Sequence, residues 1–594
     1  MGADLNATLA LGVERSLSGR RWVWREGEDR VALGIAQRAG LPEIVGRLLA
    51  ARGIGIEECG DFLDPTLRAL LPDPSTLTDM DVAAERLADA VAGGETVGVF
   101  GDYDVDGACS GAIMAGFLRG LGCAVHSHVP DRLTEGYGPN VPALRALAAR
   151  GARLIVCVDC GTAAGEALAS VRGMADVIVL DHHKAEDAPP TVLATVNPNR
   201  LDDASGLGML CAASVAFLTV VASTRVLRRR GFFAARPAPD LMALLDLVAL
   251  ATVCDVMPLT GVNRALVCQG LKVMGRRERP GIAALLAVAQ AKPLLTAMTC
   301  GFGLGPRINA AGRISQSDLG LRLLLCEDSE EAASLAQRLD EVNRQRQDVE
   351  ASILDAAFQA ADAQAQAGRA ALLVSGEDWH PGVVGIVAGR IKERFNRPVC
   401  VAGIATGIAK GSGRSVPGID LGAAVIAARR AGILATGGGH AMAAGFSLER
   451  GRLDTFHAFL NKRLAHAAAL PAAADLPIEA TLTVAGATVE LAGHVRRLAP
   501  FGSGNEEPLF VLRHARVTRA DRVGREGGTI RAFVEGEGGG IRLKAMLFRA
   551  RDGALAEALL ARAGTLHLAG HLRAEEWNGT VSAGFSVMDA APAA

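Results

Sequence analysis

Residues 97–110 read VGVFGDYDVDGACS, a stretch that crowds three carboxylates into the point where an apolar run meets small residues. Asp102, Asp104 and Asp106 stand at alternate positions directly after the apolar run Val97–Phe100. Carboxylates this close repel and raise one another's pKa unless a positive group lies among them. The stretch therefore predicts a buried strand, a turn and a helix. The carboxylates of the turn need a positive group beside them.

The sequence around this stretch alternates apolar runs with amphipathic segments. Continuous apolar strands separated by helices indicate a parallel sheet covered on both faces, which is an α/β fold. The predicted strands are 96–100, 123–129, 153–159, 175–181 and 191–197. Helices are predicted at 81–92, 108–122, 141–151 and 241–253.

Acidic residues also follow three other apolar elements. Asp159 ends RLIVCVD, Asp181 ends ADVIVLD just before His182 and His183, and Asp255 follows the apolar helix at 241–253. The carboxyl ends of parallel strands meet in one crevice of an open sheet, where ligands bind. Carboxylates with imidazole there favour Mn²⁺ or Mg²⁺. Six or more such groups suit two ions that hold a phosphate between them.

Each of these positions has a plainer interpretation when it is taken alone. An aspartate after a strand is commonly a helix cap or a turn residue, and Asp106 followed by Gly107 fits that description best. A lone His-His pair commonly lies in a core or on a surface. The joint occurrence of DYDVDG, VDCG, LDHH and VCDV on apolar elements favours the metal site.

Length, charge and cysteine content narrow the class of protein. At 594 residues the chain is long enough for several domains, and half of its residues are hydrophobic. The net charge of −2 means that a nucleic-acid partner must meet a local basic surface. No signal peptide or membrane span is expected. Eleven scattered cysteines favour a cytoplasmic compartment, and the CxxC at 157–160 is interpreted as core cysteines.

Changes in composition divide the chain into five predicted parts. A Pro-rich connector ends the first part, and an alanine-rich linker precedes the last. Short strands with glycine turns near the end suggest a small β-barrel, with the OB-fold as one candidate. The parts are an N-terminal extension (1–80), an α/β domain (81–316), a helical connector (317–368), a smaller glycine-rich α/β domain (369–465) and a β-domain (471–594).

The motifs carry a family resemblance. GDYDVDG, VDCG, LDHH and ATVCDV resemble the four acidic motifs of the DHH phosphoesterase superfamily. Further motifs follow in the same order as in that superfamily: PDRLTEGYG (130–138), GPRINAAGR (305–313), WHPGVVGIVAGRI (379–391), GSGRS (411–415) and GGGHAMAAGF (437–446). From about residue 80 onward, the chain resembles the RecJ-type exonucleases specific for single-stranded DNA. The resemblance implies a parallel-sheet DHH domain, a long connecting helix, a smaller α/β DHHA1-like domain and a C-terminal OB-like β-barrel.

The resemblance also implies roles for individual residues. The metal ligands would be Asp102, Asp104, Asp159, His182 and Asp255. Asp104 and Asp159 would contact both ions, and His183 would face the scissile phosphate. Asp106 would be either a ligand or a partner of one. Asp181 would orient an imidazole from outside the coordination shell, as ligating histidines require.

Other residues are predicted to hold the DNA strand. By the resemblance, Arg132 holds the terminal 5′-phosphate, which gives a preference for 5′ ends. Ser412 and Arg414 are expected on a glycine-rich loop that offers backbone N–H groups to an anion. Trp577 is expected at a hairpin tip of a locally basic β-domain, either stacking on a base or packing in the barrel. The remaining predicted phosphate contacts are Arg307, Asn309, Arg313 and His440.

The predicted function is a 5′-to-3′ exonuclease that uses two Mn²⁺ or Mg²⁺ ions and hydrolyses single-stranded DNA to 5′-mononucleotides, in DNA repair and recombination. The direction and the substrate come from the resemblance, which also suggests a single-strand-binding protein and a helicase as partners. One alternative is a DHH-type phosphoesterase for short oligonucleotides or cyclic dinucleotides, which the β-domain and the chain length disfavour. The other alternative is a non-catalytic scaffold, which the intact acidic motifs disfavour.

Overall fold

The computed structural model describes residues 8–132, 134–185, 187–469, 474–524, 527–550, 552–562, 564–577 and 579–593, without the side chain of Trp577. The chain forms two compact units. Unit A contains residues 60–346 and 500–506. Unit B contains the residues up to Cys59 together with 347–499 and 507–594. None of the helices in the described ranges combines the length and apolar character that a membrane span requires.

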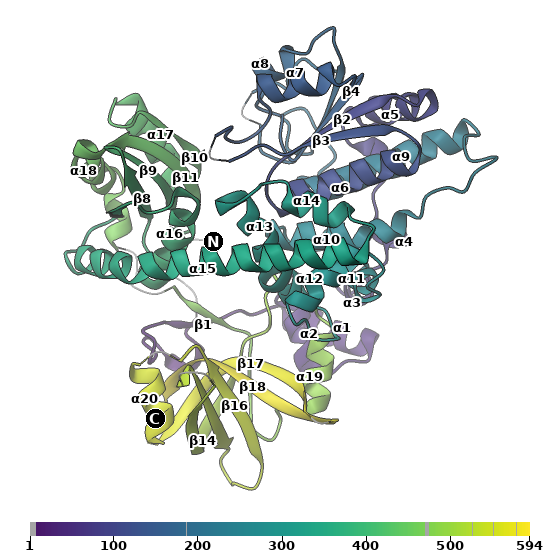
Figure 1. Ribbon diagram of the computed structural model, residues 1–594. Coiled ribbons are helices and arrows are strands. Elements are labelled where there is room, and N and C mark those ends of the chain that lie inside the picture. The colour runs from purple at the N-terminus through teal and green to yellow at the C-terminus, as the bar shows by residue number, and fades with distance from the viewer. Residues whose placement is uncertain are drawn as a thin grey trace. The chain divides into compact units, whose positions relative to one another are not determined.

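Unit A is built on a sheet of five parallel strands, which confirms the predicted fold class (Figure 1). The spatial order places β2, β4 and β5 side by side, so the three strands that precede acidic residues are direct neighbours. Their carboxyl ends consequently lie along one edge of the sheet. In spatial order the strands are β3 (Ala124–His128), β2 (Thr96–Gly101), β4 (Leu154–Val158), β5 (Asp176–Leu180) and β6 (Ala194–Val196).

Helices cover both faces of this sheet. In β4, Val156 belongs to the larger core with α5, α6 and α9, whereas Cys157 belongs to the core with α7 and α8. Cys157 and Cys160 are fully buried free thiols, which confirms their interpretation as core cysteines. From α5 to α14, the helices of unit A are α5 (Met80–Gly93), α6 (Val105–Gly120), α7 (Val141–Ala149), α8 (Gly165–Ala169), α9 (Ala212–Arg229), α10 (Leu245–Cys254), α11 (Gly261–Gly275), α12 (Pro280–Val288), α13 (Gly305–Ile314) and α14 (Leu319–Leu325).

One helix of 38 residues, α15 (Ser329–Gln366), continues from unit A into unit B. Its periodic apolar positions are buried, as the three- and four-residue spacing predicts. Leu339 packs into the large core of unit A, and Ile353 and Ala357 pack into a core with α16 (Pro381–Phe395).

The smaller α/β part of unit B has a five-stranded sheet flanked by α16 on one face and by α17 (Leu421–Arg430) and α18 (Leu453–Arg463) on the other. Its order is β10 (Thr436–His440), β11 (Ala443–Glu449), β9 (Ile408–Arg414), β8 (Val399–Ala405) and β7 (Leu372–Glu377). The prediction that GSGRS is a loop was wrong, because 411–414 lie in β9, which pairs with a strand on each side. Glycine is needed there for packing: a Cβ on Gly411 would come within 2.2 Å of the Phe446 ring.

The C-terminal part of unit B is a sheet that closes on itself. The pairing of β14 with β17 completes a ring of five strands, as expected for an OB-type barrel. Phe510 and Phe585 are buried inside it. The strands are β13 (Ala480–Leu482), β14 (Phe510–Val523), β15 (Thr529–Glu535), β16 (Arg542–Phe548), β17 (Thr565–Trp577) and β18 (Thr580–Pro592), with α19 (Val489–Arg496) and α20 (Ala554–Ala561) beside them.

The N-terminal segment is part of unit B, which the sequence did not reveal. Strand β1 (Trp22–Trp24) pairs in parallel with β12 (Leu476–Ile478). Trp22 is fully buried, and its indole N–H donates to Asp589 Oδ2 at 2.9 Å. Asp589 is itself buried, so this hydrogen bond satisfies a carboxylate inside the β-domain.

Replacing Trp22 with alanine is expected to destabilise the β-domain by roughly 3–5 kcal/mol, because it opens a large cavity and removes the indole N–H from Oδ2 of the buried Asp589. Chemical denaturation followed by circular dichroism measures this loss. Trp24→Ala is the matched control, since Trp24 is only partly buried and should cost less. Equal losses for the two variants would contradict the assigned role of Trp22.

Candidate metal centre

The opening stretch forms the junction between β2 and α6. Asp104 is the N-cap of α6, and its Oδ1 accepts hydrogen bonds from the N–H groups of Asp106 (2.9 Å) and Gly107 (3.0 Å). Asp102 is buried just before it. Gly107 must be glycine, because a Cβ would lie 2.4 Å from the Asp102 carbonyl oxygen. The turn therefore packs the three aspartates closely.

Asp106 does not cap its own helix, where Asp104 has that role. Its two carboxylate oxygens accept hydrogen bonds from the N–H groups of Ala212 (2.7 Å) and Ala213 (2.8 Å) at the start of α9. The positive end of that helix thus provides part of the missing positive partner. Asp106 is fully buried, and the predicted local turn role was wrong for it.

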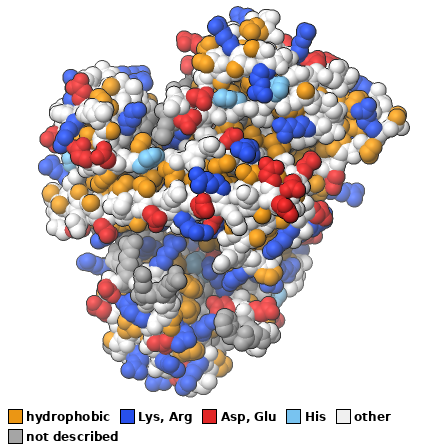
Figure 2. Space-filling view, in the orientation of Figure 1, with side chains coloured by type: hydrophobic (Ala, Val, Ile, Leu, Met, Phe, Trp, Pro, Cys, Tyr) orange, Lys and Arg blue, Asp and Glu red, His pale blue; other side chains and the backbone are white. Residues whose placement is uncertain are grey.

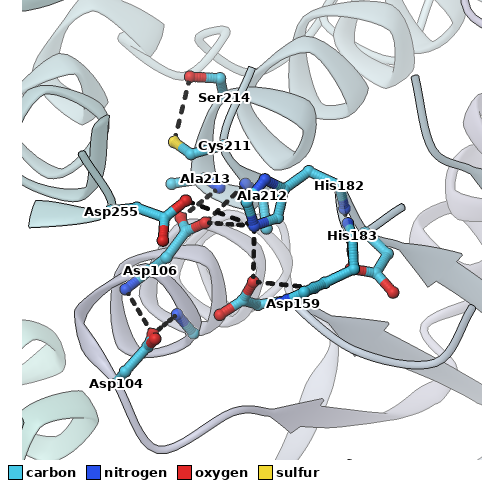
Figure 3. Close-up of polar contacts among 12 residues, drawn as sticks. Asp104, Asp106, Asp159, His182, His183, Cys211, Ala212, Ala213, Ser214 and Asp255 are labelled. Atoms are coloured by element: carbon cyan, nitrogen blue, oxygen red, sulfur yellow. Dashed lines mark hydrogen bonds and ion pairs between the residues drawn. The ribbon is translucent and has the colours of Figure 1, made fainter. Parts of the chain in front are cut away.

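The side chain of His182 lies at the centre of the acidic residues (Figure 3). Its Nε2 is 3.4 Å from Asp159 Oδ1, 3.4 Å from Asp255 Oδ2 and 3.7 Å from Asp106 Oδ2. Three sets of residues have ligand atoms within 4.8 Å of one another. These sets are Asp159 with His182 and His183, Asp106 with His182 and Asp255, and Asp102 with Asp104 and Asp159.

Two of these aspartates are placed by unusual backbone geometry. Asp159 follows β4 with φ of 59°, a left-handed conformation that is uncommon outside glycine. Its N–H donates to the Leu180 carbonyl at 2.9 Å, which ties this turn to β5. Asp255 is the C-cap of α10, and the next residue, Val256, has a φ of 59°. Backbone strain of this kind is concentrated at functional sites.

Asp181 and His183 form a separate pair at the end of β5. Asp181 Oδ1 lies 2.8 Å from His183 Nδ1 and accepts the His182 N–H at 2.8 Å, and Oδ2 accepts the Thr162 N–H at 3.0 Å. Burial alone would raise the pKa of Asp181, but these hydrogen bonds and the imidazole lower it. Burial likewise opposes the charged imidazole, yet Asp181 raises the pKa of His183 to about 9. Asp181 therefore orients His183.

The carboxyl groups around His182 are electrostatically unfavourable on their own. Burial, and secondly Asp104, raises the pKa of Asp102 to about 8. Burial, and secondly Asp106, raises that of Asp255 to about 8, and burial raises the pKa of both Asp106 and Asp159. Asp102 Oδ1, Asp159 Oδ1 and Asp255 Oδ2 are buried without a hydrogen-bond partner among the described residues. Acceptor-only oxygens left in this state fit bound cations.

The predicted phosphate contacts of unit A lie on α13 and on the segment before α7. Asn309 Oδ1 accepts the Val105 N–H at 3.2 Å, which attaches α13 to the start of α6. Arg307 is paired with Asp340 at 2.8 Å and also donates to the Gly303 carbonyl. Arg313 lies in the last turn of α13. The Arg132 guanidinium lies 5.3 Å from the ring centroid of Tyr103, a cation–π contact that places it beside the acidic turn.

The predicted contacts of unit B lie on β9, β10 and β17. Ser412 Oγ accepts from Arg414 Nη1 at 3.0 Å, and His440 is exposed at the end of β10. Because residues 411–414 belong to a paired strand, the predicted anion nest of loop N–H groups is absent there. Trp577 pairs with Thr580 across the β17–β18 turn, as the predicted hairpin tip requires, and its side chain lies outside the described residues.

Basic side chains of the β-domain are largely paired with acids. Arg516 and Arg542 both contact Glu535, and Arg531 contacts Asp521 at 2.6 Å. Figure 2 correspondingly shows acidic and basic side chains interspersed on the face it displays. Arg525, which also belongs to the locally basic β-domain, lies outside the described residues.

Two asparagines that sequence reasoning missed hold the His-His backbone. Asn197 Nδ2 donates to the His183 carbonyl at 2.8 Å, and Asn199 Nδ2 donates to the His182 carbonyl at 2.7 Å. Both belong to NPN, directly after β6. The sequence feature that could have indicated these asparagines is their position at the end of a predicted strand.

Three family models match successive parts of the chain. The model of the DHH family, N-terminal domain, matches residues 96–252, that of the DHHA1 domain matches 368–466, and that of the RecJ OB domain matches 478–589. Together with the Asp and His residues at the strand ends, these matches define a DHH-family protein.

The chain is 38% identical over 526 residues to the single-stranded-DNA-specific exonuclease RecJ of Salmonella typhimurium, covering 86% of this chain and 89% of that protein. The chain belongs to the RecJ family. The crystal structure of RecJ from Thermus thermophilus in complex with Mn²⁺ matches with a TM-score of 0.77 and 30% identity, over 94% of this chain and 78% of that one. The Mg²⁺ complex matches with a TM-score of 0.72 and 28% identity, over 95% and 76%.

Proposed function

We propose that the chain is a metal-dependent exonuclease that hydrolyses single-stranded DNA from the 5′ end and releases 5′-mononucleotides, in DNA repair and recombination. The observation that carries this proposal is the group of buried carboxylates around His182, whose oxygens lack partners among the described residues. The substrate is supported by the RecJ relatives, which are single-stranded-DNA-specific exonucleases. The direction rests on the resemblance of the motifs.

The metal ligands proposed are Asp102, Asp104, Asp159, His182 and Asp255. Carboxylate oxygens predominate among them, which suits Mn²⁺ or Mg²⁺. RecJ of Thermus thermophilus has been crystallised with each of these ions. When bound, two such ions supply an activated water and the positive charge that a departing 3′-oxygen requires. Asp106, held by α9, borders the same site.

The chain's own groups position the phosphate in this proposal. His183 is the more exposed of the two histidines, with 43% of its side chain accessible. Because Asp181 accepts the hydrogen bond from Nδ1, Nε2 is the nitrogen available to a phosphate oxygen. In unit A, the residues proposed to contact the DNA strand are Arg132, Arg313 and Asn309. In unit B, the residues proposed to contact DNA are Ser412, Arg414 and His440, and Trp577 is proposed to stack on a base.

The test of this function is cleavage of a single strand labelled at its 5′ end. We expect labelled mononucleotide as the first product with Mn²⁺ or Mg²⁺, and no product with EDTA. Blunt duplex DNA should resist cleavage. Hydrolysis restricted to dinucleotides or cyclic dinucleotides would replace the proposal with the small-substrate alternative. Failure to cleave any of them would leave a non-catalytic protein.

Arg132→Ala is expected to abolish the preference for 5′-phosphorylated over 5′-hydroxyl strands, with a loss of roughly 10- to 100-fold in kcat/KM on the phosphorylated strand only. The removed guanidinium is the group proposed to pair with the terminal phosphate. Competition between the two labelled strands measures the preference. Arg145→Ala, on the exposed side of α7, is the matched control. Equal losses on both strands would contradict the role of Arg132.

We further propose that the protein works in the cytoplasm, with a single-strand-binding protein and a helicase that expose its substrate. All eleven cysteines are free in the structure, which supports a reducing compartment. A helicase would supply the substrate from duplex DNA, because a single-strand-specific enzyme does not act on paired strands. Stimulation of duplex degradation by an added helicase tests the partnership.

A further inference from the structure

Tyr137 lies at the metal centre but is not among the residues proposed to bind the ions or the DNA strand. The chain has only two tyrosines, and both occur in motifs of the family resemblance, Tyr103 in GDYDVDG and Tyr137 in PDRLTEGYG. The Tyr137 hydroxyl donates to the Asp159 carbonyl oxygen at 3.2 Å. The same hydroxyl oxygen lies 3.2 Å from His183 Nδ1 and 3.4 Å from its Nε2, and the two rings meet edge to face with centroids 5.6 Å apart. One hydroxyl therefore contacts two separate motifs.

The contact with Asp159 falls on a strained peptide. A non-glycine residue at φ of 59° costs of order 1–3 kcal/mol and persists only when its surroundings hold it. On one side, the Asp159 N–H is held by the Leu180 carbonyl. On the other side, the Asp159 carbonyl accepts the Tyr137 hydroxyl. The Asp159 peptide is thus held on both sides, and the Tyr137 hydroxyl supplies one of the two contacts.

The contact with His183 adds a second support to that ring. Asp181 holds Nδ1 from one direction at 2.8 Å. Rotation about this single hydrogen bond would swing Nε2 away from the substrate. The Tyr137 hydroxyl, whose proton is used on Asp159, turns its lone pairs toward the imidazole and limits that rotation.

Tyr137 is presented by a segment that is anchored at both ends. Glu135 Oε1 accepts the Asp131 N–H at 3.0 Å, and Oε2 accepts from Asn140 at 2.9 Å and lies 3.0 Å from His128 Nε2. The residues on either side of Tyr137 are glycines at positive φ, 85° and 79°. They permit the sharp turn that directs the ring to the site. The same segment carries Arg132.

We propose that the Tyr137 hydroxyl is a positioning group for phosphodiester hydrolysis, which fixes the Asp159 peptide and the His183 imidazole relative to each other. It acts through these two residues and does not hold the substrate itself. This inference rests on the proposed exonuclease function. It predicts a loss of rate without a loss of strand binding or metal binding.

The test is Tyr137→Phe in the full-length protein, because this variant removes only the hydroxyl. We expect kcat on 5′-phosphorylated single-stranded DNA to fall roughly tenfold, the effect of one hydrogen bond of about 1.4 kcal/mol. KM, the dissociation constant for Mn²⁺ measured by calorimetry, and the melting temperature should stay unchanged. Unaltered kcat would overturn the inference, and so would a fall in melting temperature or a weaker Mn²⁺ affinity of similar size, which indicates a merely structural role.

Glu135→Ala provides the contrasting variant. It loosens the whole segment, including Arg132, so it should raise KM as well as lower kcat. If Tyr137→Phe gave that same combined pattern, the hydroxyl would have no role separate from the segment, and the inference would fail. The function is tested separately by the wild-type chain. Absence of cleavage by the wild type contradicts the exonuclease proposal, whereas active wild type with an equally active Tyr137→Phe contradicts only the inference.

Discussion

Replacing Asp159 with asparagine is expected to lower the rate of single-strand cleavage by roughly a thousandfold or more, with little loss of fold stability. Asp159 belongs to two of the three groups of potential ligand atoms, so its carboxylate can contribute to more than one metal position. Asparagine keeps the volume and tolerates the left-handed backbone at this position. Single-turnover cleavage of 5′-labelled single strands at saturating Mn²⁺ measures the rate.

Asp176→Asn is the matched control for this variant. Asp176 begins β5, at the opposite end of the strand from the site, and pairs with Arg86. Its replacement should leave cleavage unchanged. Circular dichroism on both variants checks folding. Retention of a tenth or more of wild-type activity by Asp159→Asn would refute the ligand assignment.

Raising the pH from 5.5 to 8.5 is expected to lower the melting temperature of the metal-free protein. The pKa values of Asp102 and Asp255 are about 8 in the fold, against an ordinary value near 4. The folded state therefore binds these protons more tightly than the unfolded chain, so stability present at low pH is lost as the pH rises through 8. A loss of only about 2 kcal/mol would lower the melting temperature by roughly 4–8 °C.

Mn²⁺ should reverse this loss, because bound cations replace the protons and bind the folded state selectively. Differential scanning calorimetry with EDTA, and then with Mn²⁺, at both pH values measures the two effects. The increase in melting temperature on adding Mn²⁺ should be larger at pH 8.5 than at 5.5. An apo protein that becomes more stable at pH 8.5, or an equal Mn²⁺ effect at both values, would contradict this account of the site.

The elements that place the site could be predicted because their signals are local. Continuous apolar runs, as in RLIVCVD and ADVIVLD, indicate parallel strands, and the residue after each one lies at the ligand-binding edge. This reasoning brought Asp159, Asp181 and His182 together in unit A, as the structure shows. It also predicted a helical connector over 317–368, of which α15 forms the larger part.

Partners that lie far apart in sequence could not be predicted. Asp106 accepts from Ala212, 106 residues away, and a backbone N–H has no sequence signature. GSGRS has the composition of a loop, yet Phe446 on the neighbouring strand packs over its first glycine and makes it a strand. Tyr137 was passed over because its role depends on the conformation of a distant peptide.

Unit B has a consequence for the order of events during synthesis on the ribosome. Trp22 leaves the ribosome early, but its hydrogen-bond partner Asp589 is made 567 residues later. At about 5–20 residues per second, that interval is roughly half a minute to two minutes. Until then the indole, which is fully buried in the folded protein, lacks its hydrogen-bond acceptor and part of the core that covers it. The nascent N-terminus therefore stays exposed to chaperones for that time, and a chain truncated before β18 would keep the β1–β12 pair but lose the carboxylate that accepts the Trp22 indole N–H.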